Sequence, residues 1–393
     1  MLRIAVIFES SPFDRKGLFN AVHNRIRHLK VAGECVVDAF CIHSRDNAFT
    51  RYVRHTPVVP KVNRTDIDGI SYRMLWYDFS VIDHFTLKYL HKKPLFFSRF
   101  IRKQVDILKE YDCILAHSFT GGLFARMASS MYGVPYFMTW HGSDIHTHPW
   151  RNPLVLRETR SVMENAVCNF FVSSALLSES ARISDTARKS VLYNGVAEEF
   201  RRMPEEERAR LRADYGLRPG DKVVAFVGSI VAVKNVYELQ PIFHKIQERF
   251  DEPLKFWMVG DGKLRAHVER MMNEDPSIDV RFWGNVPAGE MPSVMNCMDV
   301  MLLPSLNEGL PLVCAEAIRC GANAVGADAG GVSEIIGSDN VVSHGEGFAG
   351  RMAQKVVEML ESRPMQQVPD HFDWNKTAAA EMGCILAALQ RPE

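Results

Sequence analysis

Two glutamates, Glu308 and Glu316, have seven residues between them, in a stretch that predicts a strand followed at once by a helix. The first N–H groups of a helix lack partners within the helix, and with the helix dipole they suit an anion such as a phosphate. In this sequence the predicted helix start falls at residues 309–312, so their backbone groups are the candidates for such a site. Because Glu308 precedes the helix and Glu316 lies more than one turn inside it, the two carboxylates are placed to contact different parts of one elongated ligand.

A lysine follows an earlier strand in the same half of the chain. Lys234 lies at the end of a loop that begins at Gly228, and Asn235 is the predicted N-cap of the next helix. At about 4 Å and an effective dielectric constant near 20, an ammonium attracts an anionic leaving group by about 4 kcal/mol. Such a charge acts without a metal ion. The alternative is that Lys234 is a solvated loop residue.

Polar residues also follow strands in the N-terminal half. His141 and Asp144 come after a strand predicted over 136–140, in a short polar loop, and Ser118 follows a strand predicted over 113–117. We expect Asp144 either to orient a hydroxyl or to cap a helix. These three residues are the N-terminal candidates for a binding or reactive site.

The elements that must position these residues alternate between short apolar strands and longer amphipathic helices, which predicts parallel sheets covered by helices. Ligands bind beyond the carboxyl ends of the strands in such sheets. The predicted strands are 3–8, 113–117, 136–140, 169–173, 190–193, 222–228, 255–260, 280–283, 300–304 and 323–327. The predicted helices are 17–31, 121–131, 235–250, 311–320 and 347–360, with a further one from Leu264.

The alternation is interrupted once, by a densely charged segment over 198–212 that follows Asn194-Gly195-Val196. A chain of 393 residues is long enough for two α/β domains. We therefore predict two Rossmann-like domains, 1–196 and 197–374, that face a central cleft.

Composition excludes several classes of protein. Lys plus Arg and Asp plus Glu each number 47, so the net charge is zero and argues against nucleic acid as a partner. The eight cysteines form no CxxC pair and no zinc spacing, which is typical of reduced core thiols. The N-terminal apolar run is too short for a signal peptide, and no stretch reaches the length of a membrane span. We predict a cytoplasmic protein without a metal.

The setting of the two glutamates, with Pro-Ser before them, Glu-Gly at the first and Glu-Ala at the second, resembles the retaining GT-B glycosyltransferases of family 4, or glycosyl transferases group 1. The resemblance implies that Glu308 contacts the sugar of a nucleotide diphosphate donor, with UDP favoured, and that Glu316 holds its ribose. It implies a glycan or lipid-linked acceptor on the side of domain 1–196, and a C-terminal helix over about 375–393 that crosses back to that domain. The expected role is cell-surface polysaccharide or glycolipid synthesis.

The same resemblance assigns the remaining site residues. Lys234 matches the family's lysine, and a histidine at the place of His141 lies beside the donor sugar. Ser229 stands where the family usually has an arginine. The loss of one charged hydrogen bond to the donor would cost about 1.5–3 kcal/mol. We expect Arg15 or Lys16 to supply that charge, and the alternative is an ordinary solvated basic loop. The residues expected to bind the donor are Gly17, Lys16, Gly228, Ser229, Val286, Gly309, Leu310 and Glu316.

Two other functions stay open at this level: a nucleotide-sugar epimerase or hydrolase on the same fold, and a non-catalytic nucleotide-sugar-binding protein. The basic and aromatic segment 88–103 also has two interpretations. It either contacts the inner face of a membrane peripherally, or it forms an amphipathic helix packed in the fold.

Overall fold

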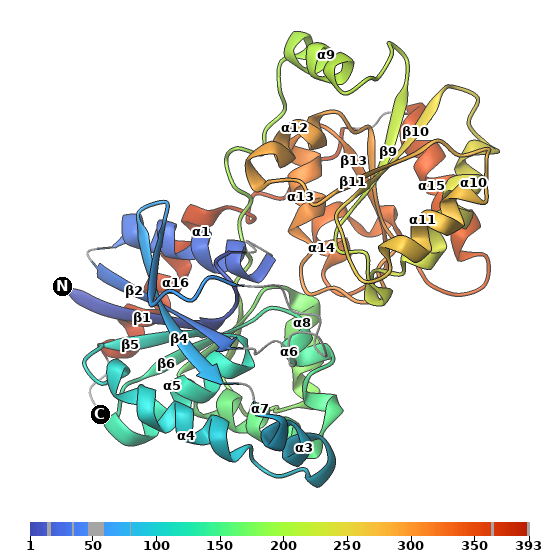
Figure 1. The fold of residues 1–393 in the computed structure, drawn as a ribbon. Coiled ribbons are helices and arrows are strands. Elements are labelled where there is room, and N and C mark those ends of the chain that lie inside the picture. The colour runs from blue at the N-terminus through green and yellow to red at the C-terminus, as the bar shows by residue number, and fades with distance from the viewer. Residues whose placement is uncertain (14–16, 34, 46–58, 79, 363–364, 391–393) are drawn as a thin grey trace. The chain divides into compact units, whose positions relative to one another are not determined.

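The computed structural model describes residues 1–393 apart from 14–16, 34, 46–58, 79, 363–364 and 391–393. Lys16 and Arg15 therefore lie outside the described residues. The chain divides into two compact units (Figure 1), one of residues 1–194 with 373–393 and one of residues 195–372. The first boundary falls between Asn194 and Gly195, within the Asn-Gly-Val segment that precedes the charged stretch.

The N-terminal unit is built on an eight-stranded sheet of order β3-β4-β2-β1-β5-β6-β7-β8. The neighbouring strands are parallel except β3 and β4, which form an antiparallel pair. The strands are β1 (Leu2–Glu9), β2 (Cys35–Arg45), β3 (Arg64–Ile67), β4 (Ile70–Asp78), β5 (Cys113–His117), β6 (Tyr136–Trp140), β7 (Cys168–Phe171) and β8 (Lys189–Val191). The central strands β5 and β6 are buried along their whole length, as expected for strands covered on both faces.

Helices cover both faces of this sheet. Helix α16 packs against α1, and α5 packs against α4 and α7, as Figure 1 shows. The helices are α1 (Gly17–Ala32), α3 (Val81–Leu90), α4 (Leu95–Gln104), α5 (Ser118–Tyr132), α6 (Ser143–His146), α7 (Pro153–Asn165), α8 (Ser174–Glu179) and α16 (Trp374–Leu389). The segment predicted to cross back from the second domain is α16, which belongs to the N-terminal unit.

The C-terminal unit is a second α/β body with an all-parallel six-stranded sheet of order β11-β10-β9-β12-β13-β14. Its strands are β9 (Lys222–Val227), β10 (Leu254–Val259), β11 (Val280–Gly284), β12 (Val300–Leu303), β13 (Asn323–Ala327) and β14 (Val341–Val342). Its helices are α9 (Glu205–Asp214), α10 (Leu239–Gln247), α11 (Arg265–Asn273), α12 (Met291–Asn296), α13 (Leu312–Arg319), α14 (Val332–Ile336) and α15 (Phe348–Ser362). Two parallel-sheet α/β units confirm the predicted fold class.

Two predictions on local structure are wrong. The helix expected over 235–250 begins only at Leu239, because Asn235 has a left-handed φ of 52° and separates two 3-10 turns. Its side chain makes no capping hydrogen bond. The charged interruption over 198–212 contains most of α9, a helix with acidic residues in its first turn and no buried residue.

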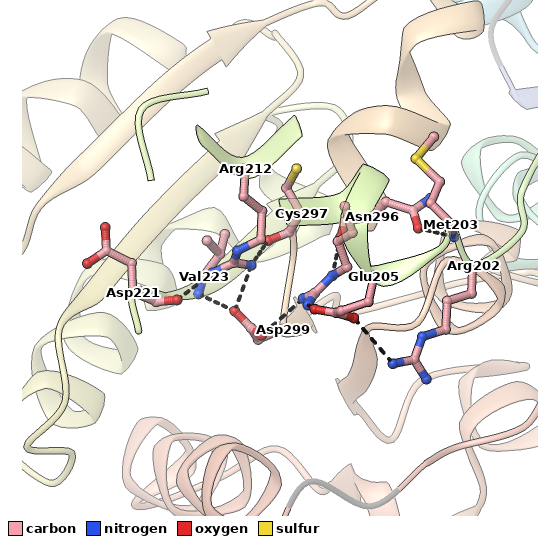
Figure 2. A network of polar contacts seen from close by, with 10 residues as sticks. Arg202, Met203, Glu205, Arg212, Asp221, Val223, Asn296, Cys297 and Asp299 are labelled. Atoms are coloured by element: carbon pink, nitrogen blue, oxygen red, sulfur yellow. Dashed lines mark hydrogen bonds and ion pairs between the residues drawn. The ribbon is translucent and has the colours of Figure 1, made fainter. Parts of the chain in front are cut away.

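Polar contacts hold α9 in place instead of an apolar face. Arg208 and Arg212 reach the two carboxylate oxygens of Asp299 at 3.3 and 3.2 Å. Asp299 also accepts a hydrogen bond from the amide of Val223 at 2.8 Å, so it connects α9 to the start of strand β9 (Figure 2). This network lies where β9 and β12 begin, at the edge of the sheet opposite their carboxyl ends.

The basic, aromatic segment 88–103 is split between the end of α3 and α4. Part of the apolar surface of α4 packs inward: Ile101 is buried, Phe97 contacts Tyr77, and Phe100 contacts Phe124, whereas Leu95 and Phe96 are exposed by 69% and 48%. The inner face of α4 thus fits the packed-helix interpretation, and peripheral contact of this segment with a membrane stays a prediction. Within the described ranges, no helix has the length and apolar character needed to span a bilayer.

A buried ion pair fixes α16 to the N-terminal unit. Arg25 of α1 donates hydrogen bonds to Glu381 of α16 at 3.3 Å, to Thr139 of β6 at 2.9 Å and to Asn194 at 3.0 Å. Arg25 and Glu381 are almost completely buried. Burial lowers the pKa of Arg25 and raises the pKa of Glu381, and the attraction between the two groups opposes both shifts.

Replacing one member of this pair leaves the other charge buried without compensation. We expect Glu381→Gln to lower the free energy of unfolding by about 3–5 kcal/mol, and the double variant Arg25→Met/Glu381→Leu to recover most of that loss. Urea unfolding of the full chain measures both. A Glu381→Gln variant as stable as the natural protein would show that the ion pair does not hold α16.

Candidate functional site

Lys234 and Glu308 form an ion pair at the carboxyl edge of the C-terminal sheet. Lys234 ends a 3-10 turn after β9, and Glu308 lies in the loop after β12, the strand beside β9. Lysine Nζ lies 2.5 Å from glutamate Oε1, and the glutamate is buried while the lysine keeps partial exposure. The amide of Leu306 donates to the carbonyl of Val233 at 2.9 Å and so fixes the two loops to each other.

Two glycines let backbone approach this pair closely. Gly330 has φ of 54°, and a Cβ placed there would lie 1.8 Å from the carbonyl oxygen of Glu308. A Cβ at Gly260 would lie 2.0 Å from the carbonyl oxygen of Gly228, the residue that precedes the Lys234 loop. The backbone of Gly330 therefore packs directly behind Glu308.

Helix α13 begins just after Glu308, as the sequence predicted. Among the described residues, the amides of Gly309 and Leu310 donate no hydrogen bond, whereas the amide of Leu312 bonds the carbonyl of Leu310 at 3.0 Å. Fewer open amides remain than the predicted run over 309–312, because Pro311 has no N–H and the amide of Leu312 is already bonded. Two open N–H groups beside an ammonium still form a positively polarised surface suited to an anion.

Glu316 lies in the second turn of α13 and is partly buried. Burial, reinforced by the nearby charge of Glu199, raises the pKa of Glu316 to about 7. A carboxyl group in this state is available near neutral pH both as a donor and as an acceptor of hydrogen bonds.

Two other predicted donor residues, Ser229 and Val286, occupy the same sheet edge, whereas Gly17 belongs to the N-terminal unit. Ser229 is exposed directly after Gly228, and it brings no charge to the position. Val286 is partly buried in the loop after β11, two strands away from β9 in the sheet. Gly17, in the N-terminal unit, is the exposed first residue of α1, where an added Cβ would meet nothing within 4 Å.

The N-terminal unit has a polar cluster at its own carboxyl edge. His141, after β6, faces His117 at the end of β5, with Nε2 and Nδ1 3.0 Å apart. Burial and the charge of Arg25 lower the pKa of His141 to about 3, and burial, His141 and Arg25 lower that of His117 well below its usual range. Both rings are therefore neutral at physiological pH, so one donates a hydrogen bond to the other. His117 was not among the predicted residues, although its place at the end of a strand beside β6 was a usable signal.

Asp144 and Ser118 have structural partners. Asp144 lies in the short helix α6, not in a loop as predicted, and its Oδ1 accepts a hydrogen bond from the amide of Phe119 at 3.2 Å near the start of α5. Burial is the main cause that raises the pKa of Asp144 to about 6. Ser118, with a left-handed φ of 65°, accepts a hydrogen bond from the amide of Glu9 at 3.1 Å. Asp144 thus bonds the start of a helix, as its predicted capping role requires, and its orientation of a hydroxyl stays a prediction.

Comparison with known protein families identifies the family of this chain. Residues 207–371 match the model described as glycosyl transferases group 1, and residues 21–195 match that of the glycosyl transferase 4-like domain. The chain belongs to the group 1 glycosyltransferases. The two matches divide near the observed unit boundary, and the first one contains Lys234, Glu308 and Glu316.

The chain has relatives of low identity. It is 28% identical over 236 residues to TuaC of Bacillus subtilis, a glycosyltransferase named for teichuronic acid biosynthesis, and the alignment covers 60% of this chain and 57% of that protein. It is 27% identical over 350 residues to the sulfoquinovosyl transferase SQD2 of Arabidopsis thaliana, with 86% and 62% covered. The chain thus spans less than two thirds of the length of either relative.

Solved structures share the architecture. The Anabaena protein HepE, in complex with UDP and glucose, matches with a TM-score of 0.68 at 16% identity, over 98% of this chain and 97% of that one. At such low identity the match shows the fold. The predicted GT-B class of this glycosyltransferase is confirmed.

The raised pKa of Glu316 has a measurable consequence for this glycosyltransferase. The folded chain keeps a proton that the unfolded chain releases above about pH 4.5, so stability from this group is complete below that pH and is lost as pH rises through about 7. Between these two pH values the free energy of unfolding of the natural protein should fall by about 3 kcal/mol at most because of this group. We expect the Glu316→Gln variant to lack this fall.

Urea unfolding between pH 5 and pH 8 tests this expectation. Glu361→Gln, on the exposed surface of α15, is the matched control and should keep the slope of the natural protein. An identical slope in the Glu316→Gln variant would contradict the assignment.

Proposed function

We propose that this glycosyltransferase moves a sugar from a nucleotide diphosphate donor, a UDP-sugar in the first instance, to a hydroxyl group of a glycan or lipid-linked acceptor, with retention of the anomeric configuration. The Lys234–Glu308 pair beside the open amides of Gly309 and Leu310 carries the proposal. The C-terminal unit holds the donor, and the N-terminal unit serves the acceptor. The product belongs to a cell-surface polysaccharide or a glycolipid, and the chain works on the cytoplasmic side of a membrane.

In this proposal the diphosphate binds where the anion-binding groups converge. The Lys234 ammonium and the two amides stabilise the negative charge that grows as the bond between the anomeric carbon and the phosphate oxygen breaks. Glu308, which is paired with Lys234 when no sugar donor is bound, contacts the sugar. The acceptor oxygen bonds to the same face of the anomeric carbon, and its proton passes to the departing phosphate oxygen.

The remaining site residues take supporting roles. Glu316 binds the ribose hydroxyls, to which a carboxyl group of pKa about 7 can both donate and accept. The neutral ring of His141 suits a sugar hydroxyl better than a phosphate. Gly228, Ser229 and Val286 border the nucleotide, and Lys16, beside Gly17, supplies the charge that Ser229 lacks. Lys16→Ala should then weaken UDP binding.

Lys234→Ala tests the central step. We expect this variant to lower kcat by about 10²–10³-fold, because it removes a charge that acts most strongly in the transition state. Sugar transfer is followed by release of the nucleoside diphosphate, with a panel of nucleotide sugars first ranked by thermal shift. Lys355→Ala, on the surface of α15, is the control. Equal activity in the two variants would exclude Lys234 from the reaction.

Stereochemistry and metal independence are checked with the preferred donor. We expect the first product seen by proton NMR to have the donor's anomeric configuration, and the rate to persist in excess EDTA because Lys234 supplies the positive charge. An inverted product would contradict the retaining path, and release of free sugar without acceptor would favour the hydrolase alternative. Donor binding without any turnover would favour the non-catalytic alternative.

A further inference from the structure

A cavity of about 280 Å³ opens in the N-terminal unit among helices α3, α4, α5 and α7. This volume is close to the lower end of the range for ligand pockets, about 300–1,000 Å³. Its floor includes residues that follow the carboxyl ends of β4 and β5, so it adjoins the edge that carries Asp144 and His141. Apolar side chains make up most of the wall: Leu87, Phe97, Ile101, Leu123, Met127 and Leu154.

Several polar groups in this wall already have hydrogen-bond or ion-pair partners, whereas the rings of His84 and His148 also line it. Asp83 accepts hydrogen bonds from the amides of Phe96 and Phe97 at 3.1 and 2.7 Å, at the start of α4. Glu158 is shared by Lys93 at 3.0 Å and Arg126 at 2.6 Å. A sugar ring would need free donors and acceptors in such a space, whereas an apolar group does not.

Ser98 and Thr120 follow the same pattern. The hydroxyl of Ser98 donates to the carbonyl of Pro94, and the hydroxyl of Thr120 donates to Glu9 at the end of β1. Apolar cavities of about 150 Å³ remain dry and take up small apolar molecules. The chemistry of this cavity therefore selects a hydrocarbon group.

Phe119 links the cavity to the polar edge of the sheet. Its amide bonds Asp144, while its ring lines the cavity and contacts His148 with the ring centroids 4.9 Å apart. One molecule with a hydroxyl end and an apolar end could place the first near Asp144 and the second beyond Phe119.

Helix α3 extends the apolar surface to the outside. Asp83, His84 and Leu87 line the cavity, while large apolar side chains elsewhere on this helix are exposed: Val81 by 59%, Ile82 by 65%, Phe85 by 53% and Tyr89 by 59%. A surface helix that is apolar on two sides is unusual for a protein in contact with water alone. Lys88 lies in its last turn, and Lys92 and Lys93 follow it, so its surroundings suit the polar surface of an anionic membrane.

We propose that this cavity holds a hydrocarbon chain of the acceptor, which reaches it past α3, while the acceptor hydroxyl lies at the carboxyl edge near Asp144. The acceptor is thus an amphiphile, a lipid-linked sugar or alcohol, and not a free glycan. The assignment rests on the proposed sugar transfer for its biological meaning. The binding of the chain itself is measured without a donor.

Alkyl glucosides with methyl, butyl, hexyl and octyl chains are suitable probes, each used below its micelle concentration with the full-length chain. Calorimetry should show affinity rising with chain length, by up to about fourfold for each buried methylene, which corresponds to about 0.8 kcal/mol. Leu123→Trp, which places a larger side chain in the cavity, should abolish this dependence. Ser130→Trp, at an exposed position of the same helix, should retain it.

Binding of UDP reports separately on the C-terminal unit, and a cooperative urea transition reports on the folding of the N-terminal unit in each variant. Should Leu123→Trp fail to fold, Met127→Phe fills less of the cavity and should reduce the gain per methylene. Affinity that is independent of chain length, or unchanged chain dependence in a folded Leu123→Trp variant, would overturn the cavity assignment even if UDP binds. Chain-dependent binding in a protein that binds no nucleotide would instead overturn the proposed transfer and leave the cavity assigned.

Discussion

The close approach of Lys234 and Glu308 is the constraint on which the C-terminal unit depends. Two residues 74 positions apart meet because β9 and β12 are neighbours in a parallel sheet and end at the same edge. The backbone supports the contact through the Leu306–Val233 hydrogen bond and through the absence of a side chain at Gly330. Strand order, loop contact and glycine thus serve one purpose, the placement of a positive charge beside an acidic group and two open amides.

Much of this could be predicted from the sequence, for identifiable reasons. The strands β5, β6 and β13 were located to the residue because short fully buried strands appear as uninterrupted apolar runs. Glu308 and Glu316 were found because they flank the start of a helix, a place where charge has a known use. The region that holds β2, β3, β4 and α3 was not assigned, since the polar residues at the ends of these elements interrupt their apolar patterns.

Other features could not be read locally. The left-handed backbone at Asn235 depends on the turn that brings Lys234 to Glu308, and a helical pattern conceals it. Helix α9 has no apolar face. Its place in the fold depends on Asp299, which lies 91 residues beyond Arg208 in the sequence. His117 pairs with His141, which follows the neighbouring strand β6, and the sequence does not show this contact between the two rings. Each of these depends on a contact between distant residues, which composition and periodicity do not record.

The burial of Arg25 has a consequence for how the chain is made. Its carboxylate partner, Glu381, comes 356 residues later, after the whole C-terminal unit. A growing chain therefore cannot cover the Arg25 face of α1 or form this ion pair until synthesis is nearly complete, whereas the C-terminal unit already has all of its own strands. Truncated chains that end before α16 would have an unstable N-terminal unit, and proteases would degrade them readily.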